Sequence, residues 1–397
     1  MAAHAEGGSA AGDNNIQLYN IAQGNFSHAE GTHTVAIGES SHAEGIETKI
    51  NSSGNGAHTE GYKTIATGPY SHTEGESDGS LINTVGQGSH SEGYKTQATG
   101  DYSHAEGKET IASGNGTHAE GSETQATDAN SHAEGYKTRA AGLFSHAEGD
   151  SNSAVGVGSH SEGSNTQALG YYSHTEGKET KVNMQGNSAH AEGYKTIAKG
   201  EYSHAEGEGD STNYINAEGR GSHSEGYNTK AKGNYSHSEG FRTVASGSQA
   251  HSSCNQTHAA GNNATALGSG SIAEGVCSLA AGTGTIAKNE NEVVIGRYNV
   301  NNHDNKLFVV GDGADDTNRK DALSFASNST KTIKVGADRT ERTLGYDLNI
   351  NGIELLDIIK SQLLDSLYPV GSIYTCTTDA ELDSNKTCPI QATLGGK

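Results

Sequence analysis

The alternation of small and polar residues along most of the chain predicts short β-strands. The pattern (Ser/Thr/Ala)-His-(Ala/Ser/Thr)-Glu-Gly occurs sixteen times, and most copies are 14 residues apart. Between these copies lies a second half-repeat, Thr-x-Ala-x-Gly, as at 64–68, 96–100 and 138–142. Alternate side chains of a strand point to opposite faces, so each half-repeat places Ser, Thr and Ala on one face and the intervening pair on the other. Two such strands with small residues inward can pack closely back to back.

The two half-repeats together predict a parallel β-solenoid over residues 1–287. Each half ends in glycine, which permits the positive φ of a sharp turn. Longer steps occur where the segments 52–56, 78–88 and 207–221 are enlarged, and the pattern resumes unchanged after each one. Insertions therefore fall at turns. We expect eighteen to twenty coils, each stacked on the previous one at about 4.8 Å.

The register of the repeat resembles that of a known family. The segment Thr34-Val35-Ala36-Ile37-Gly38 is its apolar form, and with the 14-residue period it resembles the YadA-like head repeat of trimeric adhesins over roughly residues 1–287. The resemblance implies an all-β fold, a left-handed parallel β-roll, a homotrimer and a binding rather than catalytic role. The chain departs from the family in having His and Glu at most of the places where the family often has Val and Ile.

The period breaks after residue 287, and three further segments are expected. Residues 288–345 contain the apolar runs 291–296 and 306–311, which predict a small β adaptor that closes the open end of the solenoid. Residues 346–368 contain apolar residues at spacings of three and four, which predict an amphipathic helix that forms a short coiled-coil clamp on a trimer. The clamp residues are Ile353, Leu356, Ile359, Leu363 and Leu367.

The last segment, residues 369–397, carries a second resemblance. The sequence Tyr368-Pro369-Val370-Gly371-Ser372-Ile373-Tyr374 follows the predicted helix, and this arrangement resembles the distal part of phage and prophage tail fibre or baseplate-associated proteins. In those proteins the segment opens a larger terminal domain that contains Trp, whereas this sequence has none. We therefore expect that the rest of that domain is truncated or lies on another chain.

Composition and charge exclude several classes of protein. Hydrophobic residues make up 31% of the 397 residues, too few for conventional globular cores, and only strict repetition separates this composition from that of a disordered chain. The formal charge of −22 argues against binding nucleic acid or an anionic membrane. No signal-peptide pattern and no run of 18 apolar residues occurs, so we expect no membrane insertion. The four cysteines share no spacing typical of a zinc site or a disulfide framework.

The His and Glu of the first half-repeat are the candidate site. These residues hardly vary among the copies, while the paired positions of the other half-repeat vary widely. We therefore expect the His–Glu face to contact the other subunits of a trimer and the Thr-x-Ala-x-Gly face to meet solvent. The alternative is a solvated stripe kept uniform by recent duplication. The proposed ladder comprises His28, Glu30, His42, Glu44, His72, Glu74, His104, Glu106, His132, Glu134, His146, Glu148, His174, Glu176, His204, Glu206, His237 and Glu239.

The chemistry of this face can be tested through its pH dependence. If each imidazole meets a carboxylate across the contact, the histidine pKa rises above about 6.5, and the trimer is less stable at pH 9 than at pH 6. If burial dominates, the imidazoles stay neutral and the trend reverses. Metal chelation, glycan hydrolysis and ice binding are weaker alternatives, because the repeat offers no single asymmetric cluster. We expect no catalytic residues, cofactor or structural metal.

The pattern as a whole predicts a trimeric fibre of a phage tail or a phage-tail-like particle. Such a fibre presents or connects a tip that binds a glycan or protein receptor on a host cell, and it contacts other tail or baseplate proteins at one or both ends. It would be made in the cytoplasm without a signal peptide and would be part of the virion or particle. The alternative is a bacterial surface adhesin with a YadA-like head, which predicts a signal peptide and membrane strands at its C-terminus.

Overall fold

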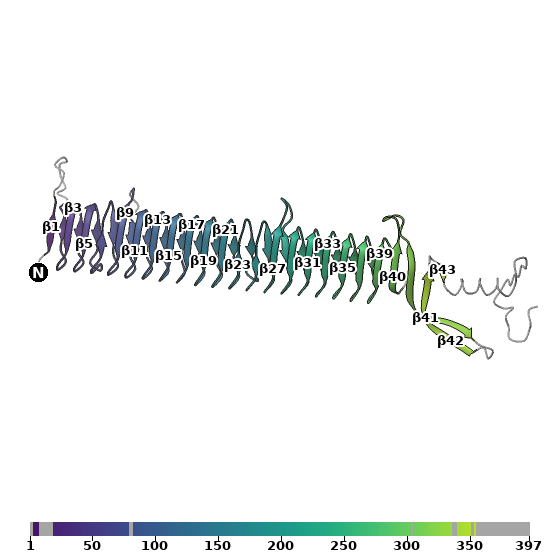
Figure 1. Ribbon diagram of the computed structural model, residues 1–397. Helices are drawn as coiled ribbons and strands as arrows, with labels where there is room; N and C mark the ends of the chain where they lie inside the picture. The colour runs from purple at the N-terminus through teal and green to yellow at the C-terminus, as the bar shows by residue number, and fades with distance from the viewer. Residues whose placement is uncertain are drawn as a thin grey trace, which may run out of the picture. The chain divides into compact units, whose positions relative to one another are not determined.

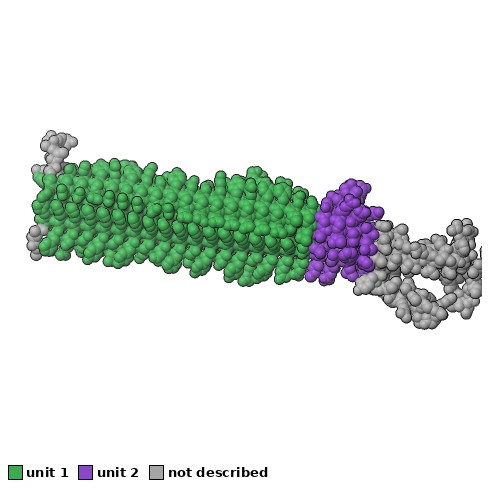
Figure 2. Space-filling model, in the orientation of Figure 1, with its two compact units in different colours: residues 1–270 green, residues 271–397 purple. Residues whose placement is uncertain are grey.

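The computed structural model describes residues 3–7, 19–78, 82–302, 305–335, 340–350 and 353–354. The chain divides into two compact units, residues 1–270 and residues 271–397, which we call unit 1 and unit 2 (Figure 2). The described part of unit 1 consists of short parallel strands connected by turns (Figure 1). The described elements of the molecule are all β-strands, and no helix occurs among the described residues. The described part of the chain therefore contains no helix long and apolar enough to cross a membrane.

Unit 1 is a parallel β-solenoid with two sheets, as the repeat predicts. The His-containing half-repeats form sheet A, and the Thr-x-Ala-x-Gly half-repeats form sheet B. The strands of sheet A are β1 (His4–Glu6), β3 (His28–Thr32), β5 (His42–Ile46), β7 (His58–Thr59), β9 (His72–Glu76), β11 (His90–Tyr94), β13 (His104–Lys108), β15 (His118–Ser122), β17 (His132–Tyr136), β19 (His146–Asp150), β21 (His160–Ser164), β23 (His174–Thr175), β25 (His190–Ala191), β27 (His204–Glu208), β29 (His223–Tyr227), β31 (His237–Phe241), β33 (His251–Asn255) and β35 (Thr265–Ser269).

Sheet B has one shorter strand for each coil. Its strands are β2 (Ile21–Ala22), β4 (Val35–Ala36), β6 (Lys49–Ile50), β8 (Thr64–Ala66), β10 (Ile82–Thr84), β12 (Gln97–Ala98), β14 (Ile111–Ala112), β16 (Gln125–Ala126), β18 (Arg139–Ala140), β20 (Ser153–Ala154), β22 (Gln167–Ala168), β24 (Lys181–Val182), β26 (Thr196–Ala198), β28 (Ile215–Ala217), β30 (Lys230–Ala231), β32 (Val244–Ala245) and β34 (His258–Ala259). The enlarged segment at 209–214 lies between β27 and β28, which confirms that this insertion falls at a turn.

The core between the two sheets is built from alanine, serine and threonine. Ala105 of β13 and Ala112 of β14 are completely buried, and the same positions are buried in the neighbouring coils. Where the inward residue of sheet A is serine, its hydroxyl bonds to the threonine opposite, as in Ser91–Thr96 at 2.7 Å. Where that residue is alanine, the buried hydroxyl of the threonine opposite has no hydrogen-bond partner, as at Thr138. The core is therefore thin, close-packed and partly polar.

Two columns of glycine let successive coils approach closely. Gly107 of sheet A has a φ of 110°, and a Cβ there would lie 2.1 Å from the carbonyl oxygen of Gly121 in the next coil. Gly100 closes the other half-repeat without a positive φ, and a Cβ there would lie 2.0 Å from the Gly114 oxygen. The expected positive φ thus occurs only in the first column. In the second column glycine permits backbone contact between most coils, although Asp128 and Asn289 occupy the position in two of them, and other residues make the left-handed turn.

Unit 2 begins with strands of the same kind and ends its parallel stacking in an antiparallel hairpin. Its strands are β36 (Ile272–Ala273), β37 (Leu279–Thr283), β38 (Ile286–Ala287), β39 (Val293–Arg297), β40 (Lys306–Asp312), β41 (Asp321–Val335), β42 (Thr340–Ile350) and β43 (Ile353–Glu354). Strands β37, β39 and β40 pair in parallel, so this pairing extends beyond residue 287. Strand β41 then pairs antiparallel with β40 and β42, which covers the edge that β40 would otherwise leave open.

The expected C-terminal helix is not seen in the residues that the structure describes. Of the predicted clamp residues, Ile353 lies in the short strand β43, and residues 346–350 belong to β42. The other four clamp residues and the segment 369–397 lie outside the described residues. The described part of the predicted segment 346–368 therefore consists of the end of β42 and the short strand β43.

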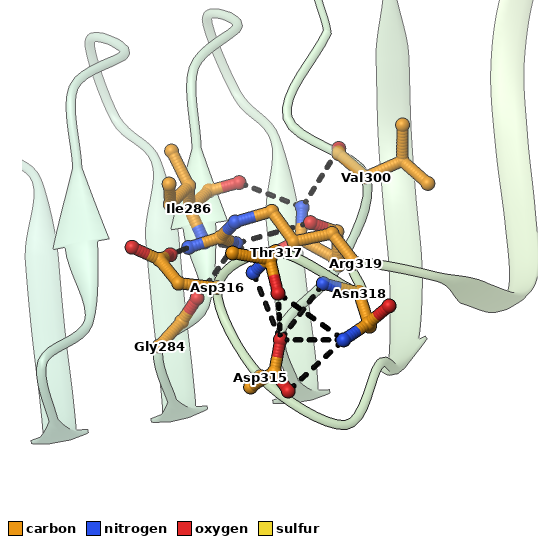
Figure 3. Close-up of polar contacts among 9 residues, drawn as sticks. Gly284, Ile286, Val300, Asp315, Asp316, Thr317, Asn318 and Arg319 are labelled. Carbon is orange, nitrogen blue, oxygen red and sulfur yellow. Dashed lines mark hydrogen bonds and ion pairs between the residues drawn. The ribbon is translucent and has the colours of Figure 1, made fainter.

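The loop between β40 and β41 contacts two other turns of unit 2 (Figure 3). The Oδ1 atom of Asp315 accepts hydrogen bonds from the backbone N–H groups of Thr317 and Asn318. These contacts and the side-chain bonds from the same two residues lower the pKa of Asp315 to about 2. The Nη1 group of Arg319 donates to the carbonyl oxygens of Gly284 at 2.9 Å and Asn299 at 3.1 Å. The loop therefore ties consecutive turns together.

Candidate functional site

Parallel, in-register pairing turns the His–Glu repeat into two continuous columns on sheet A. In β13 and β15, for example, His104 lies beside His118 and Glu106 lies beside Glu120. The Ala, Ser or Thr between each His and Glu points into the core, so the imidazole and the carboxylate point outward on the same face. All the His–Glu positions predicted as the ladder lie in these two columns of unit 1.

The histidine rings form one uninterrupted stack. From His28 to His251 each ring lies beside the ring of the next coil, with centroids 4.7–5.1 Å apart. Adjacent planes differ by 10° or less, except for 23° between His90 and His104. At β35 the stack ends, because Thr265 takes the place of histidine. The ring spacing equals the strand spacing, so the backbone dictates the stack.

Many of the imidazoles lie near a carboxylate, and His204 and His237 lie near carboxylates of two coils. The Nε2 atom of His204 is 3.5 Å from Glu206 in its own coil and 3.7 Å from Glu192 in the preceding coil. Only a few of these pairs approach hydrogen-bond distance, such as His174–Glu162 at 3.2 Å. Most of the stacked Nε2 atoms are shielded from solvent and have no hydrogen-bond partner within the described part of the chain. One chain therefore brings imidazoles and carboxylates close together but leaves most of the Nε2 atoms without a hydrogen bond.

The pKa values of the histidine column shift toward the neutral form, whereas those of the glutamate column shift in both directions. The pKa is raised at Glu162, Glu192 and Glu225 and lowered at Glu176, Glu206 and Glu239. Burial, followed by repulsion from neighbouring histidines, lowers the pKa of the imidazoles along the middle of the stack; those affected are His58, His90, His104, His132, His160, His190, His223 and His237. Hydrogen bonds to Glu176 and Glu206 raise the pKa of Glu192 to about 8. Burial raises the pKa of Glu225 to about 7. Because the imidazoles favour the neutral form, a short His–Glu distance here does not by itself mean an ion pair.

The directions of the histidine pKa shifts favour the alternative in which burial dominates and the imidazoles stay neutral. Pairing with Glu was expected to raise the histidine pKa, whereas burial and like-charged neighbours lower it in the eight imidazoles named above. The carboxylates act in the opposite direction, but their effect is smaller than that of burial. For one chain, the sign of the expected pH dependence is thus reversed. A column of neutral imidazoles can be covered by another protein surface at less cost than a column of charged ones.

The columns provide metal-ligand atoms, but not the geometry of a bound ion. Groups such as His28, Glu30 and His42 have one ligand atom each within 4.8 Å of one another. Zinc holds nitrogen ligands at about 2.0–2.1 Å, which places two ligand atoms of a tetrahedral site roughly 3.3 Å apart. Lone pairs of parallel stacked imidazoles lie in parallel planes and cannot converge on one ion. The rings would have to rotate out of the stack to bind a metal.

The turn before each sheet A strand carries a feature that the repeat analysis missed. The residue two positions before each histidine has a left-handed backbone, and in several coils it is an exposed aromatic residue, such as Tyr70 and Tyr102 with φ of 58° and 57°. In the coils between them this position is mostly glycine or serine. In the sequence these aromatic residues stand directly before Ser-His, as Tyr70 and Tyr102 do. The period-two alternation that predicts the strands does not include this turn position.

Comparison with known families agrees with the fold. The family model of the YadA head domain repeat matches residues 21–46, 255–271 and 259–285. These segments are YadA-like head repeats. They include the apolar positions Val35, Ile37 and Ile272, and the His–Glu coils between residues 47 and 254 lie outside the matches. A comparison with curated proteins gave no match.

Proposed function

We propose that this chain is the shaft of a trimeric adhesive fibre, in which the His–Glu face of sheet A contacts the other two subunits. The observation that carries the proposal is the continuous pair of His and Glu columns on one face, in which the shielded imidazoles favour the neutral form and lack hydrogen-bond partners within the described part of the chain. The YadA head repeat match supports an adhesin-like role. The thin core of small residues supports association, because so little apolar surface is buried within one chain.

Association would also supply the partners that one chain lacks. The shielded Nε2 atoms of the stack need hydrogen-bond acceptors or donors, since an unsatisfied buried polar group costs about 1–3 kcal/mol. Side chains of a second and third copy, packed along the same columns, can meet this requirement in every coil. We propose that the repeated columns set the register of three chains in this way.

The proposal also concerns the particle or cell to which the fibre belongs. The Tyr368–Tyr374 segment supports a phage tail or phage-tail-like particle, with tail or baseplate proteins at its ends and a cell-surface receptor as its target. The family match supports a bacterial surface adhesin equally well. Electron microscopy of intact particles with an antibody against this chain separates the two, because a tail fibre is labelled on the particle and an adhesin on the cell surface.

Light scattering and thiol labelling test the trimer and its contact face. We expect the purified chain to scatter as a trimer at micromolar concentration, and a folded monomer would contradict the proposal. Single cysteines are placed at His132 on sheet A and at Arg139 on sheet B, in a background free of the native four. Residue 139 should be labelled quickly and residue 132 slowly. The opposite result would show that sheet B forms the contact.

A further inference from the structure

Unit 1 carries a row of exposed aromatic side chains along the turn that precedes sheet A. All occupy the same place in the coil, two residues before the repeated histidine, and each is more than half exposed. The row comprises Phe26, Tyr70, Tyr102, Phe144, Tyr172, Tyr202 and Tyr235, with exposed fractions of 55–69%. The row belongs to neither proposed contact column, and the proposed function leaves it without a role.

The rings are regularly separated by small residues. Tyr172, Tyr202 and Tyr235 alternate with Ser188 and Gly221, so an aromatic residue occurs in every second coil there. Four of the seven rings lie against a glycine of the coil before them. A Cβ on Gly221 would lie 2.8 Å from Cδ1 of Tyr235, and glycines 56, 88 and 158 lie in the same way beneath the tyrosines that follow them. One side of each of these four rings is thus supported, while more than half of the residue meets solvent.

Local stability does not explain aromatic residues at this position. Tyr172, Tyr202 and Tyr235 have φ values of 54–58°, a left-handed conformation that suits glycine or asparagine and is unfavourable for bulky side chains. An exposed ring at a strained backbone position gains little from burial in its own chain. The same turn is left-handed at Ser40, Asn130 and Ser188, so its geometry does not require an aromatic residue.

From the spacing and chemistry of this row we infer a binding surface for an extended neutral glycan. The coil spacing gives a separation of about 9.6 Å between rings in alternate coils, twice the distance between strands. An extended β-1,4-linked glycan advances by a similar distance for every two sugars, so one face of every second sugar can stack on a ring. Sugar rings present C–H groups on their faces, which pack on aromatic surfaces.

Polar side chains flank the row and suit the hydroxyl groups of a sugar. Asn187 and Asn234 lie next to row positions, and the Oδ1 atom of each accepts a backbone N–H bond from the preceding coil. That bond fixes each side chain and leaves its Nδ2 group available as a donor. Because the chain has a formal charge of −22, a polyanionic glycan is disfavoured. A second copy of the chain is a poorer fit, because gaps at Ser188 and Gly221 interrupt the apolar surface.

Calorimetry on the full chain tests this surface with two neutral probes, cellohexaose and chitohexaose. The row variant carries Tyr172→Ser, Tyr202→Ser and Tyr235→Ser, since Ser188 already occupies this position with a φ of 55°. The control carries Tyr94→Ser, Tyr136→Ser and Tyr194→Ser, which lie on or beside sheet A strands. We expect at least one probe to bind the parent chain. The affinity of the row variant should be lower by about tenfold or more, and that of the control should be unchanged. Circular dichroism verifies that both variants fold.

The outcomes separate this inference from the proposed function on which it rests. Failure of both probes to bind, equal loss in the control, or displacement by dextran sulfate would overturn the glycan surface. Light scattering reports the trimer independently. A trimer that binds neither probe contradicts only this inference, whereas a monomer that binds a probe through the row contradicts only the trimeric fibre. Loss of trimer in the row variant alone would assign the row to a contact between subunits and would also overturn the glycan surface.

Discussion

The histidine stack should make the protein sensitive to acid. We consider a variant in which His104, His132, His160 and His190 are replaced by threonine. Threonine takes this place naturally at Thr265, where the strand pairing continues. Each of the four imidazoles has a pKa lowered by burial and by neighbouring histidines. Removing them interrupts the stack at every second coil without changing the sheet.

The sign of the effect follows from the pKa directions. A histidine with a folded pKa below its unfolded value of about 6.5 binds fewer protons in the folded state than in the unfolded state. Its contribution to stability is complete above pH 6.5, and it is lost as the pH falls below that value and through the folded pKa. The parent protein should therefore be less stable at pH 5 than at pH 8.

The size of the effect follows from the ring spacing. Two unit charges 4.8 Å apart repel by about 0.9 kcal/mol in water. Side chains such as His104 are about a third exposed, and physiological salt reduces the repulsion to roughly 0.5 kcal/mol per pair. The four replacements remove eight stacked contacts. They would relieve about 4 kcal/mol if every imidazole were protonated.

Urea unfolding followed by circular dichroism measures this effect at pH 8 and pH 5. We expect the free energy of unfolding to fall by more in the parent than in the variant, and 1 M NaCl to reduce the difference. A control with Gln97→Thr, Gln125→Thr and Gln167→Thr on sheet B should keep the pH dependence of the parent. Equal pH dependence in parent and histidine variant would refute the reasoning. Lower stability at pH 9 than at pH 6 would show that His–Glu pairing between chains dominates.

Three further changes test the packing. Gly107→Ala should destabilise unit 1 by about 3 kcal/mol or more, while Gly270→Ala, which meets no atom within 4 Å, should cost about 1 kcal/mol in thermal unfolding. Ala133→Ser gives the unpartnered Thr138 hydroxyl a partner and should stabilise by about 1 kcal/mol; Ala147→Ser faces Asn152, whose amide is already bonded, and should not stabilise. Lys306→Met leaves Asp321 unpaired and should destabilise unit 2 by about 3–5 kcal/mol, with partial recovery on adding Asp321→Asn, as measured by hydrogen exchange.

The sequence by itself determined the repeat architecture. Because the inward positions are Ala, Ser and Thr at a fixed 14-residue period, only stacked coils can bury them, and identical residues then fall side by side. The parallel pairing of β13 with β15 and the completely buried Ala105 confirm this prediction. The same logic placed His104 and Glu106 on one outward face.

Only the tertiary structure decided how that face behaves. The spacing of 4.8 Å between His104 and His118 makes like charge and burial outweigh attraction to Glu106, which no count of residues reveals. Backbone contact between coils decided that Gly100 is needed for close approach rather than for a positive φ. The aromatic row emerged because Tyr172 and its counterparts align only when the coils stack. Local patterns fix which residues face inward, while pKa shifts and surface rows depend on neighbours from other coils.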